Sequence, residues 1–148
     1  MKKILIIDDD PIVSTVYQRM LEREGFATAL ACNGAQGLDR VLSFEPDAVL
    51  LDLLMPKVNG FIVLKTIRSA FFGLPVIVIT SSCTPEFKDK ALAAGASCVF
   101  DKSTAAPTDI VDLLKLAIDG ISVNRVNAFD SANSRPRFSK EPAAPDSL

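Results

Sequence analysis

Acidic side chains follow two apolar segments that lie far apart in the chain. Asp8 and Asp9 come directly after residues 4–7, and Asp52 comes directly after residues 48–51. Two carboxylates about 4 Å apart repel each other by roughly 4 kcal/mol at an effective dielectric constant near 20. A hard divalent cation can balance such a cluster, and carboxylate oxygens suit Mg²⁺, which commonly bridges to a phosphate. If the fold brings these acids together, they indicate a magnesium site that handles a phosphoryl group.

Thr80 and Lys102, which also lie at the ends of apolar segments, complete this candidate site beside the acids. Asp52 is the candidate nucleophile, because it is a lone acid after four apolar residues and covalent phosphoryl transfer to a carboxylate is established chemistry. Lys102 would pair with that carboxylate and then with a phosphate oxygen. The hydroxyl of Thr80 would donate to another phosphate oxygen. Asp8 and Asp9 would hold the metal.

The elements that must position these residues alternate between short strands and helices. Apolar, partly β-branched runs predict five strands, at residues 4–7, 26–31, 47–52, 75–80 and 97–101. Helical spacing of apolar residues predicts helices at 11–24, 34–42, 61–70, 85–94 and 107–118. Alternation of this kind implies an α/β protein with a parallel sheet covered on both faces. Ligands of such sheets lie beyond the carboxyl ends of the strands, where the five candidate residues would meet.

The first helix carries the clearest local signals. Asp10 is expected to be its N-cap, Pro11 its first residue and Gly25 its C-terminal stop. Six apolar residues recur at helical spacing within it: Ile12, Val13, Val16, Tyr17, Met20 and Leu21. The acid Asp10 is therefore interpreted as a cap and not as a metal ligand.

The composition excludes several classes of function. The 148 residues fit one domain, and 16 basic against 18 acidic residues leave a net charge of −2, which argues against nucleic-acid binding. The absence of His excludes an imidazole base, proton shuttle or metal ligand. Three widely spaced Cys residues without a CxxC pair predict buried, reduced thiols in a cytoplasmic protein. No apolar stretch reaches the length of a membrane span.

The motifs at the four strand ends resemble those of the receiver domain of bacterial two-component response regulators. Residues 4–11 look like the opening of such a domain, and residues 51–56 with Asn59-Gly60 look like the phosphoacceptor strand and its loop. Residues 78–81 and 100–102 are similar to the two remaining signature strands. The resemblance covers about residues 2–120, and four motifs in the right order are far more specific than any one of them.

The resemblance implies a flavodoxin-like, doubly wound sheet of strand order 2-1-3-4-5 with five helices. It implies that a sensor histidine kinase or phosphotransfer protein phosphorylates Asp52. Mg²⁺ would be held by Asp9, Asp52 and the backbone carbonyl of Leu54, with Asp8 acting mainly through water. The phosphoryl group would contact Thr80 and Lys102 and bias a surface formed by the fourth helix, fifth strand and fifth helix. Such a protein is a signalling switch, as a monomer or a phosphorylation-dependent dimer, and not an enzyme.

Three positions depart from the family pattern. Ser103 stands where the family usually has a cis-proline after the lysine. Val99 stands where an aromatic residue often acts as a rotamer switch, and Phe100 comes one position later. Leu54, two residues after the acceptor, is apolar and cannot orient an attacking water, which predicts slow loss of the phosphoryl group.

Residues 121–148 differ in composition from the receiver-like part. They are rich in Asn, Ser and Pro and have no sustained periodicity, so they are expected to form a flexible C-terminal tail after a domain of residues 1–120. No DNA-binding output domain is expected in the chain, and the downstream protein is not indicated.

Other functions remain open from the residues alone. A small hydrolase with an Asp nucleophile would need a second acid two residues after Asp52, where Leu54 stands. A pseudo-receiver would keep the fold without phosphorylation, which the full set of candidate residues disfavours. A flavin or dinucleotide protein is disfavoured because no G-x-G-x-x-G follows the first strand.

Overall fold

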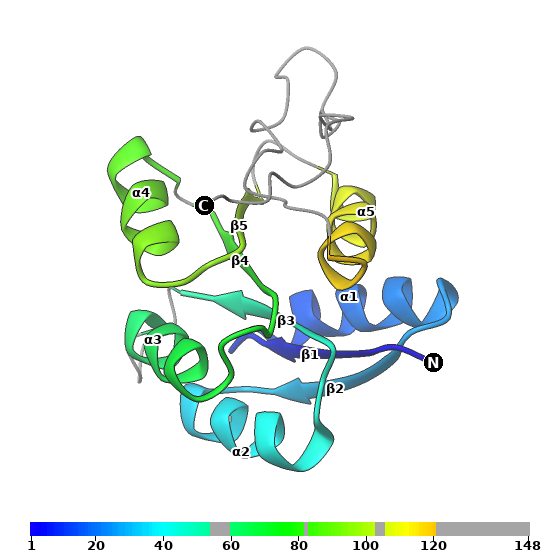
Figure 1. Ribbon diagram of the computed structural model, residues 1–148. Helices are drawn as coiled ribbons and strands as arrows, with labels where there is room; N and C mark the ends of the chain where they lie inside the picture. Colours follow the sequence, from blue (N-terminus) through cyan, green and yellow to red (C-terminus); the bar gives the residue numbers. More distant parts are fainter. Residues whose placement is uncertain (54–59, 82, 103–105, 121–148) are drawn as a thin grey trace.

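The computed structural model describes residues 1–53, 60–81, 83–102 and 106–120. Its strands and helices alternate along the chain (Figure 1). The elements are β1 (Lys3–Ile7), α1 (Pro11–Arg23), β2 (Ala27–Ala31), α2 (Gly34–Phe44), β3 (Ala48–Asp52), α3 (Gly60–Ala70), β4 (Val76–Thr80), α4 (Pro85–Ala93), β5 (Cys98–Asp101) and α5 (Pro107–Ile118). The ten predicted elements are all present, with ends that differ from prediction by one or two residues.

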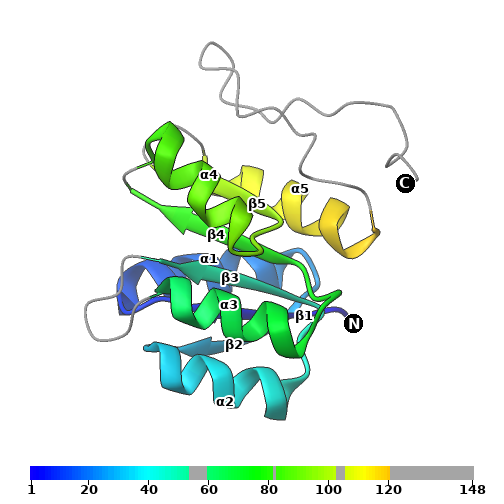
Figure 2. The same ribbon diagram turned by 60° about the vertical axis from the view of Figure 1, so that its left-hand side comes forward.

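The five strands form one parallel sheet of order β2-β1-β3-β4-β5. This confirms the flavodoxin-like, doubly wound α/β fold. α1 and α5 lie on one face of the sheet, and α2, α3 and α4 lie on the other (Figures 1 and 2). The central strands β3 and β4 are buried at every position, which explains their unbroken apolar sequences.

Strand alternation divides the core into two layers. Ile4 and Ile6 of β1 and Leu50 of β3 pack against α1 and α5. Leu5 and Ile7 of β1 belong to the layer under α2, α3 and α4. Successive side chains of a strand point to opposite faces of the sheet. A residue just beyond the end of a strand therefore continues the layer of those strand residues whose numbers are odd or even like its own.

Side-chain caps fix the starts of the helices near the sheet's carboxyl edge. The carboxylate of Asp10 accepts hydrogen bonds from the amides of Ile12 and Val13, which confirms its role as the N-cap of α1. Asn33 and Thr84 cap α2 and α4 in the same way. Gly25 follows α1 with a φ of 92°, a conformation that favours glycine.

The helical spacing of α1 identified its buried side in part, since Tyr17 and Leu21 are buried as part of the core. Ile12 is 75% exposed and Val16 is 50% exposed, whereas Ser14 is buried. Ser14 can be buried because its hydroxyl donates to the backbone carbonyl of Asp10. The expectation that all three thiols are buried holds for Cys98, but Cys83 is half-buried and Cys32 is exposed after the end of β2.

None of the helices in the described part of the chain has the length and apolar character needed to cross a membrane.

Candidate metal and phosphoryl site

The carboxyl ends of β1 and β3 bring the predicted acids together. In the parallel register Ile7 lies beside Leu51, so Asp8 and Asp52 occupy the next position on neighbouring strands. Asp8 has the parity of Ile4 and Ile6, and Asp52 has the parity of Leu50. Both acids therefore continue the face of the sheet that α1 and α5 cover.

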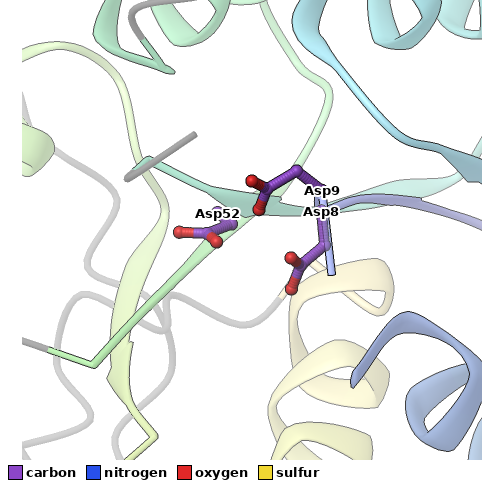
Figure 3. Close-up of side chains that lie close together, drawn as sticks. All are labelled: Asp8, Asp9 and Asp52. Carbon is purple, nitrogen blue, oxygen red and sulfur yellow. The ribbon is translucent and has the colours of Figure 1, made fainter. Parts of the chain in front are cut away.

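Asp8, Asp9 and Asp52 form one carboxylate cluster (Figure 3). One carboxylate oxygen from each residue lies within 4.8 Å of the others. Asp8 and Asp52 are buried, at 1% and 7% exposure, whereas Asp9 is exposed. The cluster is thus open to solvent through Asp9 and closed beneath its other two members.

Lys102 supplies the cationic partner that the sequence pattern predicts. Its Nζ lies 3.4 Å from Oδ2 of Asp8 and 3.8 Å from Oδ2 of Asp52. The backbone amide of Lys102 donates to the carbonyl of Thr80, which holds the residue beside the end of β4. Among the described residues, one ammonium group faces three carboxylates, which leaves an excess of negative charge in this part of the site.

The remaining contacts orient Asp8. Its Oδ1 accepts a hydrogen bond of 2.9 Å from the backbone amide of Asp10, so the turn into α1 fixes the carboxylate. Its Oδ2 accepts from Lys102. Each oxygen of this buried carboxylate therefore has a donor, as a buried charged group requires.

The donor set fits a hard divalent cation. Three carboxylates gather oxygen ligands in a small volume, and such ligands suit Mg²⁺. At 4.8 Å each pair of carboxylates repels by about 3.5 kcal/mol at an effective dielectric constant near 20, which a bound divalent charge would reverse. The predicted backbone ligand Leu54 lies outside the described residues.

The other predicted residues lie at the same edge of the sheet. Thr80 is fully buried at the end of β4, in register with Asp101 of β5. Val99 is buried in the layer under α2, α3 and α4, whereas Phe100 is buried in the opposite layer. The aromatic ring of Phe100 therefore cannot replace an aromatic residue at position 99. Ser103 lies outside the described residues.

Sequence reasoning missed one neighbour of the cluster. Tyr17, assigned only to the apolar pattern of α1, is buried, and burial followed by the charges of Asp8 and Asp52 raises the pKa of its phenol to about 12. Its helical spacing showed that it could be buried but gave no sign of what its hydroxyl would face.

The fold and the site together define a flavodoxin-like α/β protein whose candidate site gathers carboxylates beside a lysine. The chain belongs to the response regulator receiver domain family, whose model matches residues 4–115.

Known proteins with similar sequences and structures are response regulators and receiver domains. The chain is 36% identical over 103 residues to the response regulator MprA of Mycolicibacterium vanbaalenii, covering 70% of this chain and 45% of that protein. It therefore spans less than half the length of this relative. A CheY-like receiver domain protein from Methanospirillum hungatei superposes with a TM-score of 0.76 at 27% identity, over 81% of this chain and 95% of that one. The BeF3-activated receiver domain of RstA from Klebsiella pneumoniae gives 0.74 at 26% identity, over 79% and 98%.

Proposed function

We propose that this receiver domain is a switch in which Asp52 accepts a phosphoryl group in a Mg²⁺-dependent reaction. The donor is a sensor histidine kinase or a phosphotransfer protein, the partners that membership of the family implies. The observation that carries the proposal is the gathering of three carboxylates within 4.8 Å of one another, with the ammonium group of Lys102 beside two of them.

The transfer follows from the chemistry of these groups. A carboxylate oxygen of Asp52 attacks phosphorus and forms a P–O bond, while the P–N bond of the donor phosphohistidine breaks and its electron pair stays on the imidazole. Mg²⁺, when bound, would supply positive charge to the phosphoryl oxygens. Asp8 and Asp9 would hold the ion together with Asp52, Asp8 mainly through water.

Lys102 and Thr80 act on the transferred group. Lys102 is already within 3.8 Å of Asp52, so its Nζ can pass from the carboxylates to a phosphoryl oxygen with little movement. Thr80 donates its hydroxyl to a second phosphoryl oxygen. The backbone carbonyl of Leu54 is proposed as a further ligand of the ion, on the strength of the family resemblance.

The output is proposed to be a change of the surface made by α4, β5 and α5. α4 is weakly anchored, since Ala91 is its one buried residue. It contacts α3 through the edge of the Phe87 ring on Phe61, and Nζ of Lys90 lies 4.8 Å from the centroid of the Phe61 ring. Because Val99 provides no aromatic rotamer switch, we propose that shifts of the backbone carry the signal.

The remaining features of the proposed protein rest on the sequence. We propose that residues 1–120 form the receiver domain and that the protein acts in the cytoplasm on a downstream protein, whereas the predicted tail of residues 121–148 lies outside the described residues. It works as a monomer or as a phosphorylation-dependent dimer.

The surface beside the cluster supports docking of a protein donor. Ile12 and Val16 are one helical turn apart and exposed on the first half of α1, which begins two residues after Asp9. We expect Ile12→Asp to slow transfer from the phosphodonor protein by about tenfold and to leave the reaction with acetyl phosphate unchanged. The matched variant Leu42→Asp, which alters an exposed apolar residue of α2, should slow neither reaction. Equal slowing of both reactions by Ile12→Asp would contradict this docking surface.

The proposal is tested by incubating the full chain with acetyl phosphate and Mg²⁺ and measuring the intact mass. One phosphoryl adduct is expected, lost without Mg²⁺ and in Asp52→Asn, and retained in Asp101→Asn, which changes an acid at the end of the edge strand. Steady release of phosphate from unrelated esters would support a hydrolase instead. No reaction with any donor would support a pseudo-receiver.

A further inference from the structure

Tyr17 is a buried polar residue that has no role in the reaction proposed above. It is the single tyrosine of a chain without tryptophan, and it is 5% exposed in the middle of α1. It packs in the layer that contains Ile4, Ile6 and Leu50. Among the residues that the structure describes, no group accepts a hydrogen bond from its hydroxyl. A buried hydroxyl without a partner calls for an explanation.

The position of Tyr17 in the fold favours a hydroxyl that points toward the carboxylate cluster. It packs against the face of the sheet that carries Ile6 of β1 and Leu50 of β3. Asp8 and Asp52 lie two residues further along these strands and therefore on the same face. Long side chains of a helix point toward the helix N-terminus, and α1 begins just after the acids. In Figure 3 the Asp8 side chain points away from that of Asp9, toward the side on which α5 is drawn.

The charges around the hydroxyl agree with this placement. Burial, then the carboxylates of Asp8 and Asp52, raises the pKa of Tyr17 to about 12. The phenol therefore stays protonated at neutral pH and is available as a hydrogen-bond donor. The carboxylates of Asp8 and Asp52 are the acceptors whose charges act on this hydroxyl, so they are its candidate partners.

Asp8 accepts hydrogen bonds from two donors, and one of them leaves during the proposed reaction. Oδ1 is bonded to the amide of Asp10, whereas Oδ2 depends on Lys102. In the proposed reaction Lys102 moves to a phosphoryl oxygen, so Oδ2 loses its protein donor and would be left with the water that the proposed ion holds. Asp8 is 1% exposed, so bulk water cannot readily replace the lysine.

We propose that Tyr17 is a positioning residue of this site, whose hydroxyl donates to Asp8, directly or through one water, once Lys102 has moved to the phosphoryl group. This inference rests on the proposed function. The hydroxyl would then gain its hydrogen-bond acceptor only when the site holds the phosphoryl group, which explains why a hydroxyl lies in an apolar layer. The residue acts through Asp8 and does not touch the reacting atoms.

The test compares Tyr17→Phe with the full wild-type chain, using beryllium fluoride with Mg²⁺ as the phosphoryl analogue. Binding is measured from the rise in melting temperature, without any phosphoryl transfer. We expect the variant to bind the analogue about tenfold more weakly, with an unchanged response to Mg²⁺ alone, because only the analogue draws Lys102 away. The control Leu21→Val loosens the packing of α1 one turn further on, and it should lower the melting temperature without weakening the analogue.

The emission of Tyr17 provides a second, independent readout. Because the chain has no other tyrosine and no tryptophan, its intrinsic fluorescence should change when Mg²⁺ and beryllium fluoride are added together. Equal affinity of Tyr17→Phe and wild type for the analogue, or an emission that does not respond, would overturn the role of Tyr17. A wild-type chain that neither binds the analogue nor accepts a phosphoryl group would overturn the proposed function itself, and this inference with it.

Discussion

Removing one carboxylate from the cluster should stabilise the metal-free protein. The perturbation is Asp52→Asn, which keeps the size of the side chain and removes its charge. Within the described part of the chain, Asp52 has the carboxylates of Asp8 and Asp9 within 4.8 Å and the ammonium group of Lys102 at 3.8 Å.

The magnitude follows from Coulomb's law. At an effective dielectric constant near 20, the two repulsions amount to about 7 kcal/mol and the attraction to about 4 kcal/mol. The net repulsion is thus roughly 3 kcal/mol, and the exposure of Asp9 screens part of it. We expect Asp52→Asn to raise the free energy of unfolding by about 1–3 kcal/mol in the absence of divalent ions.

Urea unfolding followed by circular dichroism measures this effect, first in EDTA and then with MgCl2. Since Mg²⁺ stabilises the folded state only when it binds there, the wild type should gain more stability from the ion than the variant. Asp39→Asn, which removes an exposed acid of α2, is the matched control and should change little. A variant less stable than wild type in EDTA would refute the reasoning, because it would mean that the attraction to Lys102 exceeds the repulsion within the cluster.

Three further predictions concern packing, the lifetime of the phosphoryl group and the thiols. Gly60→Ala should destabilise the protein by about 1–3 kcal/mol in the same urea assay, since its Cβ would come within 2.5 Å of the backbone of Leu53, next to the proposed acceptor Asp52. Gly73→Ala, whose Cβ would meet nothing within 4 Å, is its control, and equal losses would contradict the close approach. Leu54→Asn should shorten the half-life of the phosphorylated protein in a mass-spectrometric time course, because an amide can orient the attacking water; an unchanged half-life would count against this. In alkylation with iodoacetamide near pH 8, the exposed Cys32 should react first and Cys98 last, since burial raises the pKa of Cys98 to about 11 and leaves little thiolate; the opposite order would be inconsistent with the burial of Cys98.

The sequence was informative where burial on both faces of the sheet demands unbroken apolar runs. The runs of β3 and β4 could be recognised because every residue in them is buried. The meeting of Asp8, Asp52 and Lys102 could be predicted because parallel strands end at a common edge. The strand order came from the family resemblance, since the alternation of elements leaves several orders possible.

The errors arose where residue type is a poor guide to burial. Ile12 and Val16 are apolar but exposed, because the side of α1 that meets the sheet runs through Ser14 and Tyr17. Cys32 was expected inside, yet it lies beyond the end of β2, where its Sγ contacts the side chain of Gln36. Periodicity predicts the side of a helix on which a residue lies. It does not show which groups of other segments lie near a hydroxyl such as that of Tyr17.

The central claim is that Asp52 is the residue that becomes phosphorylated. It is tested most directly by treating the full chain with acetyl phosphate and Mg²⁺, trapping the acyl phosphate by reduction with borohydride, and locating the converted residue by tandem mass spectrometry. We predict conversion at Asp52 that disappears when Mg²⁺ is withheld. Conversion at Asp8 or Asp9 instead, or at Asp52 to the same extent without the metal, would contradict the account.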